Sequence, residues 1–95
     1  MKIEKIEEGG RLTLAIEGRI DTITAPELES ALTYDGVDEL VFDLAKVDYI
    51  SSAGLRVLLS AQKKMMGKSM KIANPCKPVM EVFDITGFSS IFTFI

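Results

Sequence analysis

A strand-like segment and a helix-like segment meet at residues 49–55, and this junction limits the possible folds more than any other stretch of the chain. The apolar run Leu40–Leu44 precedes the junction, and apolar residues at spacings of three and four follow it. Ser51 and Ser52 therefore lie where a helix is expected to begin. The first turn of a helix has backbone N–H groups without intrahelical partners and carries about half a positive charge, so it accepts an oxygen atom or an anion well.

The two serines allow a structural and a functional interpretation. A serine before a periodic apolar run is the ordinary start of a helix, so one hydroxyl group can simply cap it. However, Ala53 and Gly54 put little side-chain bulk on the first turn, so another molecule can approach the backbone and the hydroxyl groups. Glycine also costs about 1 kcal/mol relative to alanine inside a helix, so Gly54 requires a reason.

The first third of the chain predicts a hairpin followed by a helix. Alternating apolar residues indicate a short strand around Ile3–Ile6 and a second strand over Leu12–Ile16, with a turn at Gly9-Gly10 and an end at Gly18. Thr24 and Glu27 then have the spacing of a capping box, with Pro26 in a first turn that needs no amide donor. We expect the helix that they open to end near residues 34–36.

The rest of the chain predicts strands that alternate with helices. The resulting order of elements, β-β-α-β-α-β-α-β, indicates the α/β class: one domain over residues 1–95, with a mixed four- to five-stranded sheet and about three helices packed on it. The expected later elements are a central strand over Val37–Leu44, a helix over Ala53–Met66, a strand over Met70–Ala73, a helix from Pro78 to Gly87 and an edge strand over Ile91–Ile95.

Composition narrows the class of function. A chain of 95 residues has little room for an internal active-site cavity. The net charge of -3 argues against a nucleic-acid partner. Cys76 is the one cysteine, so no internal disulfide forms, and we expect a cytoplasmic protein in which Cys76 is a small buried or capping residue. No apolar stretch is long enough for a signal peptide or a membrane span, so we expect no membrane insertion.

The inventory of reactive side chains argues against an enzyme. The chain has no histidine, so neither a Ser-His-Asp arrangement nor a zinc site of the usual Cys/His kind can form. A serine-lysine pair has no support from spacing. The sequence Gly67-Lys68-Ser69 looks like the end of a phosphate-binding P-loop, but the first glycine of that motif would fall at Gln62, inside a predicted helix.

Four strings carry a resemblance to a known family. They are Y-I-S-S-A-G-L-R-V-L-L at the junction, F-D-L-A-K-V-D directly before it, G-R-I-D-T-I-T-A-P-E-L earlier in the chain and D-I-T-G-F near the C-terminus. Together they resemble the STAS domain of bacterial anti-sigma factor antagonists over essentially the whole chain. The resemblance implies that the serine two residues before the glycine, Ser52, is phosphorylated by a partner kinase. In the family the preceding residue is often aspartate; here it is Ser51, so two adjacent hydroxyl groups are candidates.

The resemblance also implies a partner-binding surface beside the serines. In the family the G-x-x-D loop contributes to this surface, and Asp21 matches its acidic position. The alternative is that Asp21 is an ordinary loop residue. Asp48, just before the junction, is a second acidic residue to consider, and its alternative role is that of an ordinary turn residue. The predicted surface comprises Asp21, Thr22, Ser51, Ser52, Ala53, Gly54 and Arg56.

Two functions follow from the resemblance. The first is an anti-sigma factor antagonist that binds an anti-sigma factor serine kinase and is switched off by phosphorylation of Ser52, with a serine phosphatase as a further partner. The kinase supplies the nucleotide chemistry, so we expect no bound cofactor. The alternative is a STAS accessory subunit of a membrane transport assembly of the lipid-transport ATPase type, in which Ser52 is only a cap.

Overall fold

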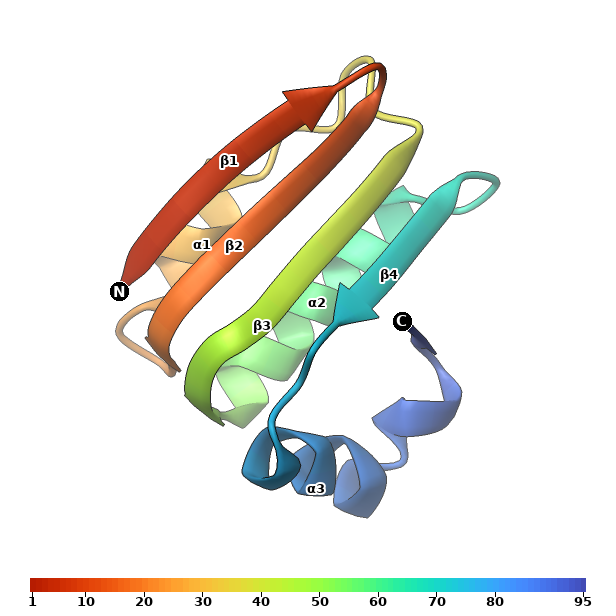
Figure 1. Ribbon diagram of the computed structural model, residues 1–95. Coiled ribbons are helices and arrows are strands. Elements are labelled where there is room, and N and C mark those ends of the chain that lie inside the picture. The colour runs from red at the N-terminus through yellow and green to blue at the C-terminus, as the bar shows by residue number, and fades with distance from the viewer.

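The structure is a computed structural model that describes residues 1–95, and it contains one five-stranded sheet with three α-helices (Figure 1). The strands follow one another across the sheet in chain order; β1 is antiparallel to β2, and the other neighbours are parallel. The predicted α/β class and mixed sheet are therefore confirmed. The elements are β1 (Lys2–Glu8), β2 (Arg11–Ile20), α1 (Ala25–Ala31), β3 (Glu39–Ile50), α2 (Ser52–Lys64), β4 (Ser69–Ala73), α3 (Lys77–Thr86), a 3-10 helix (Phe88–Ser90) and β5 (Thr93–Phe94).

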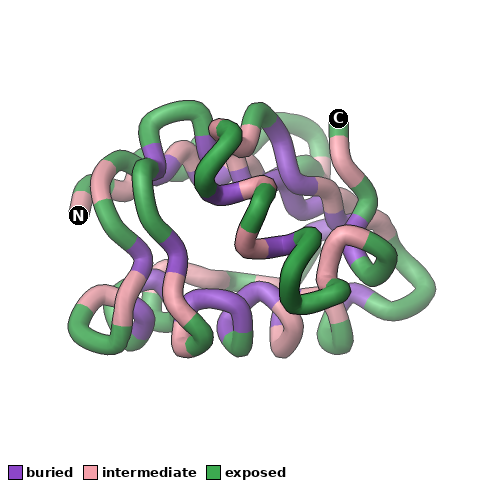
Figure 2. Tube along the Cα trace, turned by 90° about the horizontal axis from the view of Figure 1, so that it is seen from below, coloured by how far each residue is buried: buried purple, intermediate pink, exposed green.

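Helices α1 and α2 cover one face of the sheet, and the core lies between the two layers (Figures 1 and 2). Alternate residues of β2, namely Leu12, Leu14 and Ile16, are buried against this helical layer, as a period of two requires. The opposite face carries ion pairs between neighbouring strands: Glu39 accepts from Arg11 at 2.9 Å and from Lys71 at 3.2 Å. The sheet therefore has one apolar face and a second face, the charged face, on which charged side chains lie among apolar ones such as Val41.

Helix α3 lies beyond the end of β3 and closes the C-terminal part of the core (Figure 1). The ring of Phe83, which is fully buried, meets those of Phe92 and Phe94 edge to face, with centroids 5.7 and 5.4 Å apart. The C-terminal strand is shorter than predicted, Thr93–Phe94 instead of Ile91–Ile95, because residues 88–90 form a 3-10 helix and Phe92 turns into the core.

Strand β3 is longer than predicted, since it continues past Leu44 to Ile50. Its pairing with β2 shifts by one residue twice, so β3 has one more residue than β2 at each of two bulges. These bulges change the spacing of buried residues from two to three, at Leu44, Val47 and Ile50. Asp48 lies in the second bulge, so its interpretation as a turn residue is wrong.

Strand β2 also continues past its predicted end at Gly18. Gly18 has a φ of +112°, which is open to glycine but not to most residues, and the pairing shifts next to it. Pairing then resumes, with Arg19 opposite Tyr49 and Ile20 opposite Ile50. As a result, β2 and β3 end side by side.

Cys76 is half-buried and unpaired, at the N-cap position of α3. Its side chain makes no capping bond; instead, the thiol donates to the backbone oxygen of Val47 at 3.2 Å. The residue therefore links the start of α3 to the bulged part of β3.

Candidate functional site

The predicted site residues come together where β2 and β3 end. The backbone N–H of Ser51 donates to the oxygen of Ile20 at 2.8 Å, so the loop after β2 lies against the start of α2. This is the edge of a parallel sheet at which the carboxyl ends of neighbouring strands meet, a common place for binding sites in α/β folds. Asp21 and Thr22 are thus close to the serines, as the family resemblance implies.

The two serines have different environments. Ser51 is the N-cap of α2: it is half-buried, and its Oγ accepts from the backbone N–H of Gly54 at 3.4 Å. Ser52 is the first residue of the helix and is exposed, and its hydroxyl group makes no hydrogen bond within the chain. Helix α2 therefore begins one residue earlier than predicted, and the capping role belongs to Ser51, which leaves the hydroxyl group of Ser52 free.

Gly54 is buried, and its lack of a side chain allows α2 to approach the sheet. A Cβ atom at this position would lie 2.6 Å from Cγ2 of Ile20 and 2.8 Å from Cγ1 of Ile50. Both distances are far below van der Waals contact, so an alanine here would require the neighbours to move. The expectation that Gly54 leaves the first turn open to another molecule is therefore wrong; its side facing the chain is filled by β2 and β3.

Asp21 closes the start of α1. Its Oδ1 accepts from the backbone N–H groups of Ile23 and Thr24, each at 3.0 Å, and lies 3.1 Å from the hydroxyl group of Thr24. The hydroxyl group of Thr24 in turn accepts from the N–H of Asp21 and donates to the oxygen of Arg19, both at 2.8 Å. Because Thr24 is used in this way, its side chain does not cap the helix, and the predicted capping box with Glu27 is wrong.

The carboxylate of Asp21 is stabilised in its charged form. The backbone N–H of Thr24 lowers the pKa of Asp21 below its ordinary value of 3.8, partial desolvation opposes this effect, and the hydroxyl of Thr24, the N–H of Ile23 and the side chain of Arg19 lower the pKa further. Arg19 Nε lies 3.5 Å from Oδ2 of Asp21, and its guanidinium group stacks over the ring of Tyr49, 4.4 Å from the centroid. The loop after β2 is thus tied to the end of β3 through side chains as well as backbone.

A hollow of about 300 Å³ runs between α1 and α2 beside these residues. Thr22 and Pro26 line it from the side of α1, and Ala53 and Arg56 line it from the side of α2. Arg56 is exposed and makes no ion pair within the chain. Thr22, Ala53 and Arg56, three of the predicted partner-binding residues, therefore share one concave surface.

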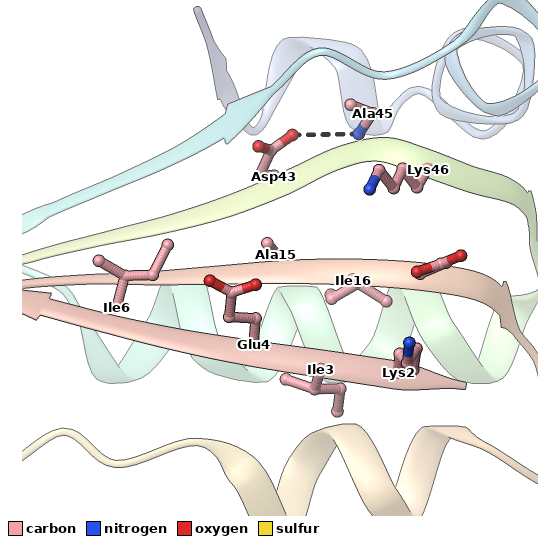
Figure 3. A pocket seen from close by; sticks show the side chains of 10 residues that line it. Lys2, Ile3, Glu4, Ile6, Ala15, Ile16, Asp43, Ala45 and Lys46 are labelled. Atoms are coloured by element: carbon pink, nitrogen blue, oxygen red, sulfur yellow. Dashed lines mark hydrogen bonds between the residues drawn. The ribbon is translucent and has the colours of Figure 1, made fainter.

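A second, larger hollow of about 460 Å³ lies on the charged face of the sheet (Figure 3). Side chains of both signs line it: Lys2, Glu4, Glu17, Asp43 and Lys46. None of the predicted site residues contributes to it. The carboxylate of Asp43 already makes a hydrogen bond within the chain, because its Oδ1 accepts from the backbone N–H of Ala45 at 3.1 Å.

The candidate site contains hydroxyl groups, one carboxylate and arginines, but no histidine that could activate a nucleophile. No group of three or more potential metal ligands lies together anywhere in the chain. None of the helices has both the length and the apolar character needed to cross a bilayer.

Sequence reasoning missed Ile23 in the loop after β2. Its side chain is 86% exposed, although it is large and apolar. The available signal was an isoleucine between two threonines in an otherwise polar loop, where neither helix nor strand periodicity explains it.

The structure defines a small α/β domain with a mixed sheet and two helices on one face. The family model described as STAS domain matches residues 2–95, so the chain belongs to the STAS domain family. The resemblance found in the sequence is therefore confirmed.

Several proteins similar to this chain carry the name of anti-sigma factor antagonists. BtrV of Bordetella bronchiseptica carries the name of an anti-sigma factor antagonist. It is 38% identical to this chain over an alignment of 97 residues, which covers 97% of this chain and 84% of BtrV. The crystal structure of an anti-sigma factor antagonist from Mycobacterium paratuberculosis has a TM-score of 0.88 and 25% identity, covering 98% of this chain and 83% of that one. The phosphorylated form of the Bacillus cell fate determinant SpoIIAA has a TM-score of 0.74 over 99% of this chain and 91% of its own; at 12% identity it shows the fold alone. The chain thus has the fold and the sequence relationships of anti-sigma factor antagonists.

Proposed function

We propose that this protein is an anti-sigma factor antagonist that docks on an anti-sigma factor serine kinase and releases it when Ser52 is phosphorylated. The unmodified protein would bind through the loop of Asp21 and Thr22 and through the first turns of α2, where Ser51, Ala53 and Arg56 lie. Binding would displace the sigma factor from the kinase. A serine phosphatase would restore the active, unmodified form.

The observation that carries this proposal is the free hydroxyl group of Ser52 at the positive end of α2. Ser52 is exposed and has no hydrogen-bond partner in the chain, whereas the hydroxyl group of Ser51 is already used as the cap. A kinase needs an accessible hydroxyl, so the difference favours Ser52 over Ser51.

A phosphate on Ser52 would be tolerated by the fold. No acidic residue occupies the first turn of α2, and the helix dipole favours an anion there. Arg56 follows Ser52 by four residues, so the two side chains lie on the same side of the helix. We therefore expect the switch to act through charge at the interface, with little change in the core.

At the interface itself the same phosphate would be costly. It adds about -1.5 to -2 charges at residue 52, which is uncharged in the unmodified protein that binds the kinase. Repulsion and desolvation of several kcal/mol would lower the affinity by about 100-fold or more, because each 1.4 kcal/mol corresponds to a factor of about ten. The names of the relatives favour this function over that of a transport subunit.

The test measures binding of purified anti-sigma factor kinases from the organism that encodes the chain. Wild type and Ser52→Ala should bind the cognate kinase equally well, whereas Ser52→Asp should bind about tenfold or more weakly, since it places one negative charge at the interface. Ser90→Asp is the matched control, because it adds the same charge at an exposed serine of the 3-10 helix, outside the predicted surface. Equal affinities for Ser52→Ala and Ser52→Asp would overturn the proposal.

Mass spectrometry separates the two serines directly. After incubation with the kinase and Mg²⁺-ATP, we expect one added phosphate on wild type and on Ser51→Ala, and none on Ser52→Ala. Phosphate on Ser51 instead would assign the switch to the other hydroxyl group.

A further inference from the structure

Ile23 is the most unusual side chain near the candidate site. It is 86% exposed, in a loop whose other side chains are polar. Exposure of an isolated apolar residue is common on protein surfaces and carries no conclusion by itself. The setting of Ile23 gives it more meaning.

The loop holds Ile23 in a fixed position. The N–H of Ile23 donates to Oδ1 of Asp21 at 3.0 Å, and the next residue, Thr24, is fixed by its bonds to Asp21 and to the oxygen of Arg19. Arg19 in turn stacks on Tyr49 at the end of β3. The backbone of Ile23 is therefore held before any partner binds, so little backbone conformational entropy is lost in a complex.

The surroundings of Ile23 match those of a binding anchor. Thr22, the preceding residue, lines the hollow between α1 and α2 together with Ala53 and Arg56. Arg56 is exposed and has no acidic partner in the chain. An exposed apolar side chain next in the chain to Thr22, with an unpaired arginine across the hollow, is complementary to a surface that offers an apolar pocket and a carboxylate.

We propose that Ile23 is the apolar anchor of the anti-sigma factor interface and enters a pocket of the kinase beside a carboxylate that pairs with Arg56. This inference rests on the proposed function, and it adds a specific contact that phosphorylation does not touch. Ser52 would then control whether the complex forms, while Ile23 would supply much of its affinity.

A second isoleucine provides a matched control. Ile85 is exposed to the same extent as Ile23, 86%, but lies on α3, which contributes no residue to the hollow between α1 and α2. Replacement of either residue by serine removes the same apolar surface from an exposed position, so both variants should fold. Thermal melting of Ile23→Ser and Ile85→Ser checks this before binding is measured.

The experiment compares the affinities of both variants for the kinase that binds wild type. We expect Ile23→Ser to weaken binding about tenfold or more, as loss of an anchor residue does, and Ile85→Ser to leave it unchanged. Equal affinity of Ile23→Ser and wild type, or equal losses for both variants, would overturn the inference. If Ser52→Asp still weakens binding in that case, the proposed function stands without the anchor. If wild type binds none of the anti-sigma factor kinases, the proposed function fails and the inference fails with it.

Discussion

Helices α1 and α2 begin side by side, yet their N-termini are completed in opposite ways. The start of α1 is closed by the carboxylate of Asp21, which accepts two backbone N–H groups, and a second acidic residue, Glu27, lies in the first turn. The start of α2 has one neutral cap, Ser51, and no acidic residue in its first turn. One positive helix end is therefore already neutralised, and the other is left for an added anion. The difference shows how one fold can combine a loop closed by a carboxylate with a helix start that carries no negative charge.

Substitution of Gly54 should have the largest effect on stability among the changes near these helix starts. The Cβ atom of Gly54→Ala would lie 2.6 Å from Cγ2 of Ile20, at the end of the strand that leads to α1. We expect a loss of about 1 to 3 kcal/mol in the free energy of unfolding, measured by chemical denaturation. Ile20→Leu removes the Cγ2 branch, so the cost of Gly54→Ala should be smaller in that background. A gain in stability of about 1 kcal/mol, as for an ordinary helical glycine, would contradict the close contact between the two regions.

The two serines at the start of α2 should differ in a smaller but measurable way. Ser51→Ala removes the cap and should cost about 0.5 to 1 kcal/mol, at the low end for N-caps because the bond to Gly54 is long. Ser52→Ala removes an exposed hydroxyl without a partner, so its free energy of unfolding should stay within about 0.5 kcal/mol of wild type. Thermal or urea denaturation of both variants gives the comparison. A larger loss of stability for Ser52→Ala than for Ser51→Ala would mean that Ser52, and not Ser51, caps α2.

Much of the fold was predictable because its core follows simple periodicities. The alternation of Leu12, Leu14 and Ile16 defined a half-buried strand, and the apolar spacing after the junction defined α2. The ends of β2 and β3 were not predictable in the same way. The bulges change the buried spacing in β3 to three residues at Leu44, Val47 and Ile50, and a period of three is typical of neither strand nor helix.

The candidate site was predictable in position but not in the role of each side chain. The resemblance to the STAS family implied that the two segments of the site lie together, and the structure gives the physical reason: β2 and β3 are parallel and end side by side. Hydrogen bonding within the loops decides the rest. The hydroxyl group of Thr24 bonds to the backbone of Asp21 and Arg19 instead of forming the capping box, and Gly54 packs closely against Ile20. Sequence spacing cannot distinguish these partners, because they depend on contacts between residues that only the folded chain brings together.

The smallest expected effect concerns the charge that closes α1. Because hydrogen bonds from Thr24 and its neighbours lower the pKa of Asp21 in the folded protein, the ionised form stabilises folding above the ordinary value of 3.8, and this contribution is lost as the pH falls below it. Asp21→Asn keeps an oxygen that can accept the same N–H groups but cannot titrate. We therefore expect wild type to be more stable than Asp21→Asn at about pH 6 and the difference to shrink toward about pH 2, as followed by urea denaturation across that range. Asp48→Asn, at a carboxylate without a hydrogen bond in the chain, controls for the loss of one negative charge. A difference between wild type and Asp21→Asn that does not change with pH would mean that the start of α1 is closed by hydrogen-bond geometry alone, and charge would then no longer distinguish the two helix starts.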